Sequence, residues 1–394
     1  MQTSIDLLQN LVDLPSVNGS SGELALARKI CELLQAEGLP ARCQQVDENK
    51  ANVLLFLQGA DRERCIVWNG HLDTVEGGDL AAWTSSPWQS EIREGRLYGR
   101  GSSDMKAGLS AMLCCLINWK RRGIKPKTNL FFCATCDEER QGRGAEALLD
   151  YPEIASAETF IISEPTALHL CTAEKGCLWL KMKFCGKTSH AAYAEQGCNA
   201  ATYAFIFAQA LERALTHYHH PLLGKSTVVI TGIHAGIASN MVPDQAEMSL
   251  DIRLTPDLPK TVLESIIHDC VEQTCRKAGG LLSIFFETGN ERLPLALKEE
   301  CFWAGEIRRA SAELRVPCQD CGINFFSDAS IFARVNPGAD MIIWGPGEPQ
   351  MAHQTDEYVK LERYQNYIDL LKRVFAEEVR STEQTREFTE VELR

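Results

Sequence analysis

Three short apolar runs in this sequence each end near acidic residues, and this repeated pattern constrains the fold more than any other feature. A short apolar run bounded by turn residues is typical of a buried strand. The runs, with the acidic residues that follow them, are 65–68 with Asp73, 130–134 with Glu138 and Glu139, and 160–162 with Glu164. In an open α/β sheet the site lies beyond the carboxyl ends of the strands. The pattern therefore predicts an α/β fold with a polar site along one edge of its sheet.

His71 and Asp73 lie two residues apart at the end of the first run. Strand side chains alternate between the two faces of a sheet, so we expect both side chains to point the same way. The imidazole is well placed to hold a metal ion. The carboxylate is expected to hold the far ring nitrogen of His71 and to fix its tautomer. On its own, however, His-x-Asp is a weak motif, and an ordinary structural role is favoured without further residues.

Further candidate ligands come from two loops. Asp104 lies in the glycine-rich segment 98–108, which precedes a predicted helix over 109–122. His353 follows a predicted strand over 341–344 and a Gly-Pro-Gly turn. Two imidazoles and several carboxylates form a donor set that suits zinc or a related divalent ion. The sequence therefore predicts a metal site at the carboxyl edge of the sheet.

Taken together, these motifs resemble a known family. The chain is similar to the dinuclear-zinc amidohydrolases and exopeptidases that include acetylornithine deacetylase, succinyl-diaminopimelate desuccinylase, aminoacylase and glutamate carboxypeptidase. Five motifs carry the resemblance, in family order and at family spacing: G-H-L-D-T, G-R-G-x-x-D-M-K-A-G, D-E-E, S-E-P-T and A-H-x-T-D-E-Y. The resemblance covers nearly the whole chain. It implies a zinc-exopeptidase-like α/β catalytic domain, a mixed sheet flanked by helices, with an inserted α+β lid and dimerisation domain.

The resemblance assigns a metal-binding role to five residues. His71 and Glu164 would hold one ion, Glu139 and His353 the other, and Asp104 would bridge both. The implied cofactor is two Zn²⁺ per subunit, with Co²⁺ or Mn²⁺ as substitutes. Two such cations, about 3.5–4 Å apart, clamp a water and the scissile carbonyl oxygen.

The same resemblance places Glu138 as the general base, and Asp73, expected to orient His71, is counted with it among the catalytic residues. A general base takes the proton of the attacking water and hands it to the leaving nitrogen. Adjacent residues at a strand end point in opposite directions, so Glu138 and Glu139 can divide the duties of base and ligand. In most proteins a Glu-Glu pair is a solvated turn, but here it follows an apolar strand and completes a larger pattern.

The chain is predicted to contain two domains, one of them interrupted. Residues 1–175 and 288–394 would form the catalytic domain, with a charged tail from about residue 380, and residues 176–287 would form the lid. Alternation and helical periodicity predict a βαββαβ insert. Its predicted strands cover 178–184, 227–233, 246–254 and 281–287, and its predicted helices cover 200–215 and 258–279.

Three lid residues match the family's functional positions. His190 matches a histidine that reaches the partner subunit's active site, where it would stabilise the oxyanion of the tetrahedral intermediate. Asn240 and Arg253 match residues that hold the substrate carboxylate, a task for which the arginine fork is suited. The resemblance thus implies a homodimer formed through the lid.

Other residues qualify the resemblance. Ser330 stands where many family members have an arginine, which puts strict succinyl-diaminopimelate specificity in doubt. The cluster of His217, His219 and His220 is read as a helix end rather than as a third metal site. The Cys-x-x-Cys pairs 133/136 and 318/321 leave open a structural zinc site, but most of the sixteen cysteines are read as reduced, small apolar residues.

Composition excludes several classes of function. The net charge of −13 argues against a nucleic-acid partner. No apolar stretch reaches the roughly 18 residues of a membrane span. The first residues lack the pattern of a signal peptide, so we expect a cytoplasmic protein.

These observations predict a metal-dependent hydrolase that cuts the amide bond of an N-acyl amino acid, like acetylornithine deacetylase. The substrate would be a small N-acyl amino acid or a short peptide. A dipeptidase or carboxypeptidase of the same family is the first alternative. A catalytically inactive homologue that serves as a binding protein is a second alternative, which is disfavoured because no metal or base position is substituted.

Overall fold

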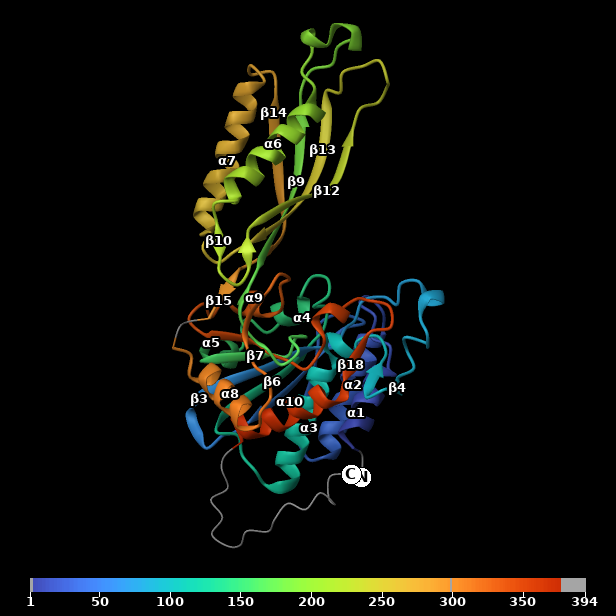
Figure 1. The fold of residues 1–394 in the computed structure, drawn as a ribbon, viewed down its shortest axis with the longest axis vertical. Helices are drawn as coiled ribbons and strands as arrows, with labels where there is room; N and C mark the ends of the chain where they lie inside the picture. Colours follow the sequence, from blue (N-terminus) through green and yellow to red (C-terminus); the bar gives the residue numbers. More distant parts are fainter. Residues whose placement is uncertain (1–2, 298–299, 377–394) are drawn as a thin grey trace. The chain divides into compact units, whose positions relative to one another are not determined.

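The computed structural model describes residues 3–297 and 300–376, which form two compact units (Figure 1). Of the described residues, the first unit comprises 3–172, 297, 300–321 and 327–376, and the second comprises Ala173–Ala296 and Gly322–Phe326. The predicted insert of 176–287 thus falls within the second unit. The charged tail predicted from about residue 380 lies outside the described residues. The predicted α/β class, with an α+β insert, is confirmed.

A large mixed sheet forms the centre of the first unit. Its strands are β1 (Arg42–Gln45), β2 (Ala51–Leu57), β3 (Asp61–His71), β6 (Thr128–Thr135), β7 (Thr159–Ile162), β8 (Leu170–Glu174) and β17 (Asp340–Ile343). They are ordered β1-β2-β6-β3-β7-β17-β8, and β15 (Leu295–Ala296) continues the same sheet beyond β8. Strands β6, β3, β7 and β17 are parallel to one another, whereas β1, β2 and β8 pair antiparallel. The carboxyl ends of the four parallel strands therefore meet at one edge of the sheet.

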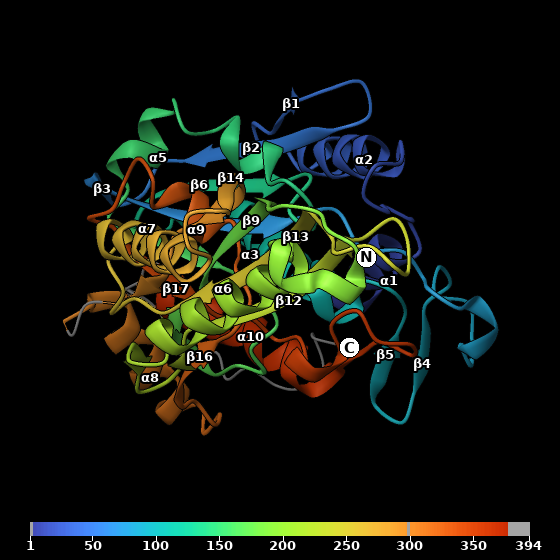
Figure 2. The ribbon, with the colours of Figure 1, turned by 90° about the horizontal axis from the view of Figure 1, so that it is seen from above.

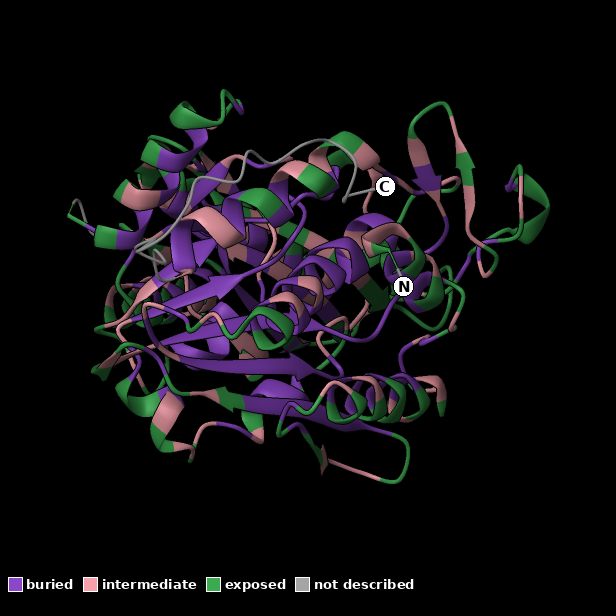
Figure 3. Cartoon of the chain, turned by 90° about the horizontal axis from the view of Figure 1, so that it is seen from below, coloured by how far each residue is buried: buried purple, intermediate pink, exposed green. Residues whose placement is uncertain are grey.

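Helices cover both faces of this sheet. Successive strand side chains point to opposite faces, so each face has its own set of apolar residues for the helices to pack on. Trp68 of β3 packs on Trp119 and Phe375, at ring distances of 5.4 and 5.2 Å. The opposite face packs Phe131 of β6 against Tyr151, at 6.0 Å. The first face carries α1 (Ser4–Val12), α2 (Gly22–Ala36), α3 (Ala107–Arg122), α8 (Phe302–Glu313) and α10 (Leu361–Phe375), and the second carries α4 (Arg143–Glu146), α5 (Pro152–Ser156) and α9 (Ala329–Phe332). Figure 2 shows α2 alongside β2, and Figure 3 shows that the central strands are buried.

Local signals account for the first and third helices. The Thr3 side chain and the Asp6 side chain each accept the other residue's backbone N–H, which closes a capping box at the start of α1. Gly123 follows the last residue of α3 and caps the helix. Its φ of 66° is the left-handed conformation that glycine adopts without strain. Three basic residues in the last turn of α3 suit the negative end of the helix dipole.

Short elements complete the first unit. A three-stranded sheet, ordered β18-β5-β4, consists of β4 (Glu91–Arg93), β5 (Arg96–Tyr98) and β18 (Tyr358–Lys360). The other short elements are the 3₁₀-helices η1 (Leu80–Ala82) and η4 (Pro349–Met351), the π-helical segment η2 (Ser102–Lys106) and strand β16 (Asp320–Ile323), which pairs with β8.

The second unit is a four-stranded antiparallel sheet with two helices on one face (Figure 1). Its strand order is β12-β13-β9-β14, and the predicted βαββαβ sequence of elements is found. Phe184 of β9 packs on Phe207 at a ring distance of 5.9 Å. The elements are β9 (Gly176–Cys185), η3 (Ala191–Gln196), α6 (Ala200–Leu215), β10 (His219–His220), β11 (Gly224–Lys225), β12 (Thr227–Ala235), β13 (Gln245–Leu254), α7 (Lys260–Lys277), β14 (Ser283–Arg292) and β15 (Leu295–Ala296).

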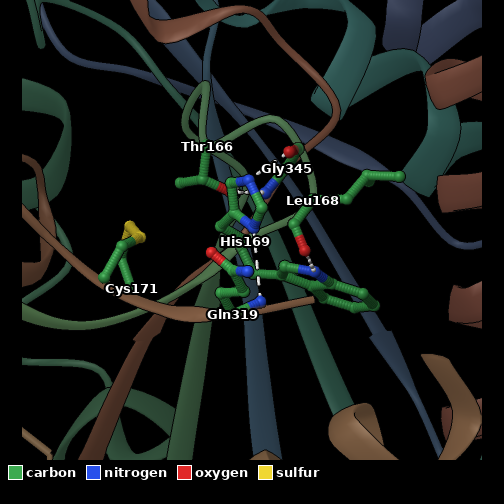
Figure 4. Close-up of a disulfide and its surroundings, with 8 residues drawn as sticks. Thr166, Leu168, His169, Cys171, Gln319 and Gly345 are labelled. Carbon is green, nitrogen blue, oxygen red and sulfur yellow. Dashed lines mark hydrogen bonds between the residues drawn. A yellow bond between two sulfur atoms is a disulfide. The ribbon is translucent and has the colours of Figure 1, made fainter. Parts of the chain in front are cut away.

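One cysteine pair departs from the predicted reduced state. Cys171 and Cys321 form a disulfide that joins β8 to β16, with Cα atoms 4.6 Å apart (Figure 4). Beside it, the Gln319 backbone N–H donates to His169 Nδ1 at 3.2 Å. The alternative of a zinc site built from the Cys-x-x-Cys pairs is therefore wrong for Cys321. The other fourteen cysteines are free thiols.

No helix of the described residues is both long and apolar enough to cross a membrane.

Candidate metal centre

The predicted ligands of the first unit gather where its parallel strands end. His71 closes β3, Glu139 follows β6, Glu164 follows β7, Asp104 lies in η2 and His353 follows η4. Two groups of donor atoms, each within 4.8 Å of one another, occur among the residues that the structure describes: one from His71, Asp104 and Glu139, the other from His71, Glu138 and Glu164. The cluster of His217, His219 and His220 contributes to neither group.

Asp104 stands between the two imidazoles. Its Oδ1 lies 3.0 Å from His71 Nε2, and its Oδ2 lies 3.5 Å from His353 Nε2. His71 Nε2 is also 3.9 Å from Glu164 Oε1, and His353 Nε2 is 3.0 Å from the Glu139 carboxylate. Each imidazole thus shares Asp104 and has a second carboxylate of its own. Nitrogen and oxygen donors in this arrangement fit two divalent ions bridged by one carboxylate.

The negative charge of the buried carboxylates in this cluster also favours the binding of cations. Burial, and then the charge of Glu164, raise the pKa of Glu138 well above its usual range. Burial likewise raises the pKa of Glu164 and of Glu139, the latter helped by the charge of Asp104. Crowded, buried carboxylates disfavour their own ionised forms, and a bound divalent ion reverses that effect. The donor set and its negative charge therefore both suit bound divalent ions.

Asp73 lies against His71 in a manner different from the predicted one. His71 Nδ1 is 2.8 Å from the backbone carbonyl oxygen of Asp73, whereas the Asp73 carboxylate is 3.9 Å away. Because the carbonyl can only accept, Nδ1 carries the proton and Nε2 is left as the ligand atom. The Asp73 carboxylate instead accepts the backbone N–H groups of Glu138 at 3.1 Å and Glu139 at 3.0 Å. It therefore positions the segment that carries the candidate base.

Glu357 holds the loop of Asp104, a role that the sequence did not reveal. Its buried carboxylate accepts the backbone N–H groups of Gly101, Ser103 and Asp104 at 2.9, 2.8 and 3.0 Å. The Arg100 guanidinium donates to the same carboxylate at 2.7 Å. The residue belongs to the A-H-x-T-D-E-Y motif, but nothing in its spacing indicated these partners.

The Gly-Pro-Gly turn allows two loops of the site to approach each other. A Cβ atom on Gly345 would lie 2.5 Å from the carbonyl oxygen of Glu164, and one on Gly347 would lie 2.1 Å from that of Ser103. Both distances are far below van der Waals contact with backbone. The absence of a side chain at these positions therefore lets the segments of Glu164 and Asp104 lie as they do.

The predicted lid residues lie in the second unit. His190 and Asn240 are exposed and neighbouring, since the Ala191 N–H donates to the Asn240 carbonyl at 2.9 Å. His190 Nδ1 accepts the Ala192 N–H at 3.1 Å, so the proton of a neutral His190 ring lies on Nε2. Arg253 of β13 donates to Asp251 at 2.8 and 3.1 Å, so its fork already holds a carboxylate.

Ser330 has a structural role in the first unit. It lies in α9 and is buried, and its hydroxyl donates to the Ser327 carbonyl at 2.7 Å. This bond stabilises the first turn of a short helix and leaves no cationic group at the position.

Comparison with known proteins shows which family the chain resembles. The sequence profile of peptidase family M20/M25/M40 matches residues 67–377, which span the metal centre and the whole second unit. The chain belongs to this family. The positions of all five predicted ligands and of the predicted base lie within the matched range.

Relatives within the M20 family cover nearly the whole chain. A probable succinyl-diaminopimelate desuccinylase of Staphylococcus aureus is 27% identical over 398 residues, covering 93% of this chain and 95% of that protein. An acetylornithine deacetylase of Vibrio cholerae is 26% identical over 387 residues, covering 94% and 96%. The crystal structure of aminopeptidase PepT from Bacillus cereus shares the fold, with a TM-score of 0.77, 19% identity and coverage of 94% and 96%. This M20 family member is thus a metal-dependent hydrolase of amide or peptide bonds, as predicted.

Proposed function

We propose that this M20 family member is a dinuclear zinc deacylase that cuts the amide bond of a small N-acyl amino acid, in the manner of acetylornithine deacetylase. The position of Asp104 between His71 and His353 is the observation that carries the proposal, because it offers one carboxylate oxygen to each imidazole. Two relatives along nearly the full chain bear the names of deacylases, which favours an N-acyl amino acid as substrate.

In this proposal Glu138 is the general base. Bound zinc ions would supply Lewis-acid polarisation of the scissile carbonyl and a water of lowered pKa. Glu138 is adjacent to the ligand Glu139 but has its carboxylate within 4.8 Å of His71 and Glu164 donors. Its carboxylate takes a proton from the attacking water and delivers it to the leaving nitrogen. Burial favours the protonated carboxyl that must form between these two transfers.

Lid residues would complete the site in a homodimer. We assign to the partner subunit's His190 the donation of a hydrogen bond to the oxyanion of the tetrahedral intermediate. Asn240 and Arg253 would bind the substrate carboxylate, although Asp251 must then release part of the Arg253 fork. These three roles depend on dimerisation through the second unit.

A dipeptidase or carboxypeptidase activity is the second candidate. It is favoured by the name of the matching family, peptidase family M20/M25/M40. Both activities use the same ligands and the same base, so they differ only in the group on the carbonyl side of the scissile bond. An inactive binding homologue is disfavoured, because all five ligand positions and the base position keep chemically competent residues.

A substrate panel tests the proposal. The purified, zinc-loaded protein is assayed with N-acetyl, N-succinyl and N-carbamoyl amino acids and with unblocked dipeptides. We expect turnover of at least one N-acyl amino acid, at a kcat/KM at least tenfold above that of any dipeptide. Faster cleavage of dipeptides would select the peptidase alternative, and no cleavage of either class by a metal-loaded dimer would contradict both.

A further inference from the structure

A buried polar cluster lies next to the metal centre in the first unit. Its members are Asn18, Glu23, Lys50, Asp73 and Asp137, and all five are buried. Lys50 is the centre of the cluster. Its Nζ forms a close ion pair with Asp137, and it lies 3.3 Å from Asn18 Oδ1 and 3.6 Å from Glu23 Oε1.

An ammonium group in this position needs an explanation. Lysine is almost never fully buried unless it is paired, because removing its charge from water is costly. Lys50 directly follows the exposed residues Glu48 and Asn49 and directly precedes β2, and it is nevertheless only 7% exposed. A second cation near Asp137 is Arg143, whose Nε is 3.8 Å from Oδ2 and whose side chain is half exposed. Lys50 is therefore the close, buried cation of this cluster.

One connection from Lys50 reaches the candidate base through Asp137. Asp137 directly precedes Glu138 and has a φ of 66°, which is unusual for a residue with a side chain. Its backbone N–H donates to Glu23 Oε2 at 2.9 Å, and its carbonyl accepts the Gly142 N–H at 2.6 Å. The backbone N–H, the carbonyl and the carboxylate of Asp137 are thus all bonded, the carboxylate to Lys50. These three bonds fix the direction in which the chain enters Glu138.

The other connection passes through Asn18. The Lys50 ammonium can only donate, so it fixes the Asn18 amide with its oxygen toward Lys50. The Asn18 NH₂ group then donates to Asp73 Oδ2 at 2.6 Å. The same Asp73 carboxylate accepts the backbone N–H groups of Glu138 and Glu139. Without the ammonium, the amide could rotate and turn its oxygen against the Asp73 carboxylate.

We propose that Lys50 is a positioning residue for the catalytic segment, holding Glu138 and Glu139 in place through Asp137 on one side and through Asn18 and Asp73 on the other. The inference rests on the proposed function, since it assumes that Glu138 is the base and Glu139 a metal ligand. The side chains that Lys50 contacts, those of Asp137, Asn18 and Glu23, are not among the five candidate metal ligands. Its effect should therefore appear in kcat and in metal retention, and not in KM.

Lys50→Met tests the proposal, because methionine keeps most of the volume and removes the charge and the donors. The full-length, metal-loaded variant is compared with the wild type in kcat, in KM and in the rate at which a chelator removes Zn²⁺. Loss of an outer partner of a metal site typically costs about 10–100-fold in metal affinity or activity. We expect kcat to fall and Zn²⁺ release to quicken, each by about 10–100-fold, with KM within a factor of about two.

Tyr364→Phe is the matched control. It removes a buried hydroxyl of the same unit, which bonds Ser110 at 2.8 Å and the Ser4 carbonyl at 2.7 Å, away from the cluster. This variant should lose thermal stability but keep wild-type kcat and Zn²⁺ release. If Lys50→Met behaves like Tyr364→Phe, with a lower melting temperature and unchanged kcat and Zn²⁺ release, Lys50 is merely structural and the inference is wrong.

Asn18→Ala covers the case in which Lys50→Met does not fold, because it keeps the Lys50–Asp137 pair. It should lower kcat and quicken Zn²⁺ release, as Lys50→Met should. Wild-type kcat and Zn²⁺ release in folded Asn18→Ala would show that the path through Asn18 and Asp73 does not hold Glu138 and Glu139 in place.

The rate of Zn²⁺ release is measured without substrate. It therefore tests the role of Lys50 even if no compound of the substrate panel is cleaved. A wild-type protein that binds no divalent metal would overturn the proposed function and, with it, this inference.

Discussion

The Glu357 carboxylate accepts the backbone N–H of Asp104 at 3.0 Å, so the residue between the two imidazoles is held by its main chain. Two neighbouring N–H groups and Arg100 donate to the same carboxylate. Four donors on one buried carboxylate fix a loop more firmly than the Asp104 side chain could do alone.

Glu357→Gln should therefore weaken the metal site without removing a ligand. An amide offers one acceptor oxygen and turns an NH₂ group toward other donors, so at least one N–H of the loop loses its partner. We expect about a 10–100-fold loss of Zn²⁺ affinity with the fold retained. Competition with a chelator of known affinity measures the loss, and an affinity equal to that of the wild type would show that the loop does not need this carboxylate.

Glu138→Gln should leave the metal content intact and remove turnover. The change eliminates proton transfer but no ligand, and a positioned general base is worth typically about 10²–10⁴-fold. Metal analysis and steady-state kinetics on one preparation check both parts. Activity near that of the wild type with full metal content would exclude Glu138 as the base.

Asp104→Asn should lower the metal content from two ions per chain to at most one. The amide keeps one acceptor oxygen but loses the charge and the second oxygen, which a bridging ligand needs. Elemental analysis of protein prepared without chelator gives the stoichiometry, with Asn240→Ala as a control that should retain two ions. A content of two in Asp104→Asn would contradict the bridging role.

His190 should act in the site of the other subunit. If so, mixing His190→Ala with Glu138→Gln should restore activity, because one site of the heterodimer has an intact base and receives the partner subunit's His190. Each parent homodimer lacks one part at every site. Loss of one oxyanion donor costs about 10²–10³ in rate, so recovery would stand out from the background. Verified subunit exchange with no gain in activity would show that His190 does not work across a dimer.

Glu23 should make stability depend on pH. Burial, and then the charge of Asp73, raise the pKa of Glu23 to about 7 from a usual 4.5. Between these values the folded state binds more protons than the unfolded state, so the contribution is full below pH 4.5 and is lost as the pH rises through about 7. The unfolding free energy of the wild type relative to Glu23→Gln should thus fall between pH 5 and pH 8, by at most about 3 kcal/mol. Denaturant titrations of both proteins measure it, and a difference that rises with pH would contradict the shift.

The sequence predicted the sheet well, because contiguous apolar residues mark strands that are buried on both faces. Ile66, Trp68 and Phe132 could be predicted to lie in buried strands from their apolar neighbours in the sequence alone. The acidic residues behind those runs then marked the carboxyl edge. The same reasoning failed for the Asp73 side chain, since β3 ends at His71 and strand alternation no longer applies two residues later.

The residues that hold the site could not be predicted in this way. Lys50 follows a polar segment and has the pattern of a solvated lysine, yet its partner Asp137 lies 87 residues further along the chain. Glu357 bonds backbone N–H groups more than 250 residues earlier. Contacts between a side chain and a distant main chain leave no periodic signal, because backbone donors carry no sequence information.

The disulfide between Cys171 and Cys321 closes a covalent loop whose ends are 150 positions apart, and Ala173–Ala296 of the second unit lies within that loop. A protease that cuts the second unit anywhere in this stretch would therefore not separate the two halves of the chain. The amino-terminal fragment would keep His71, Asp104, Glu139 and Glu164, the carboxyl-terminal fragment would keep His353, and the two would migrate as one species until a reductant divides them. A nicked chain thus keeps all five candidate ligands on one covalent molecule.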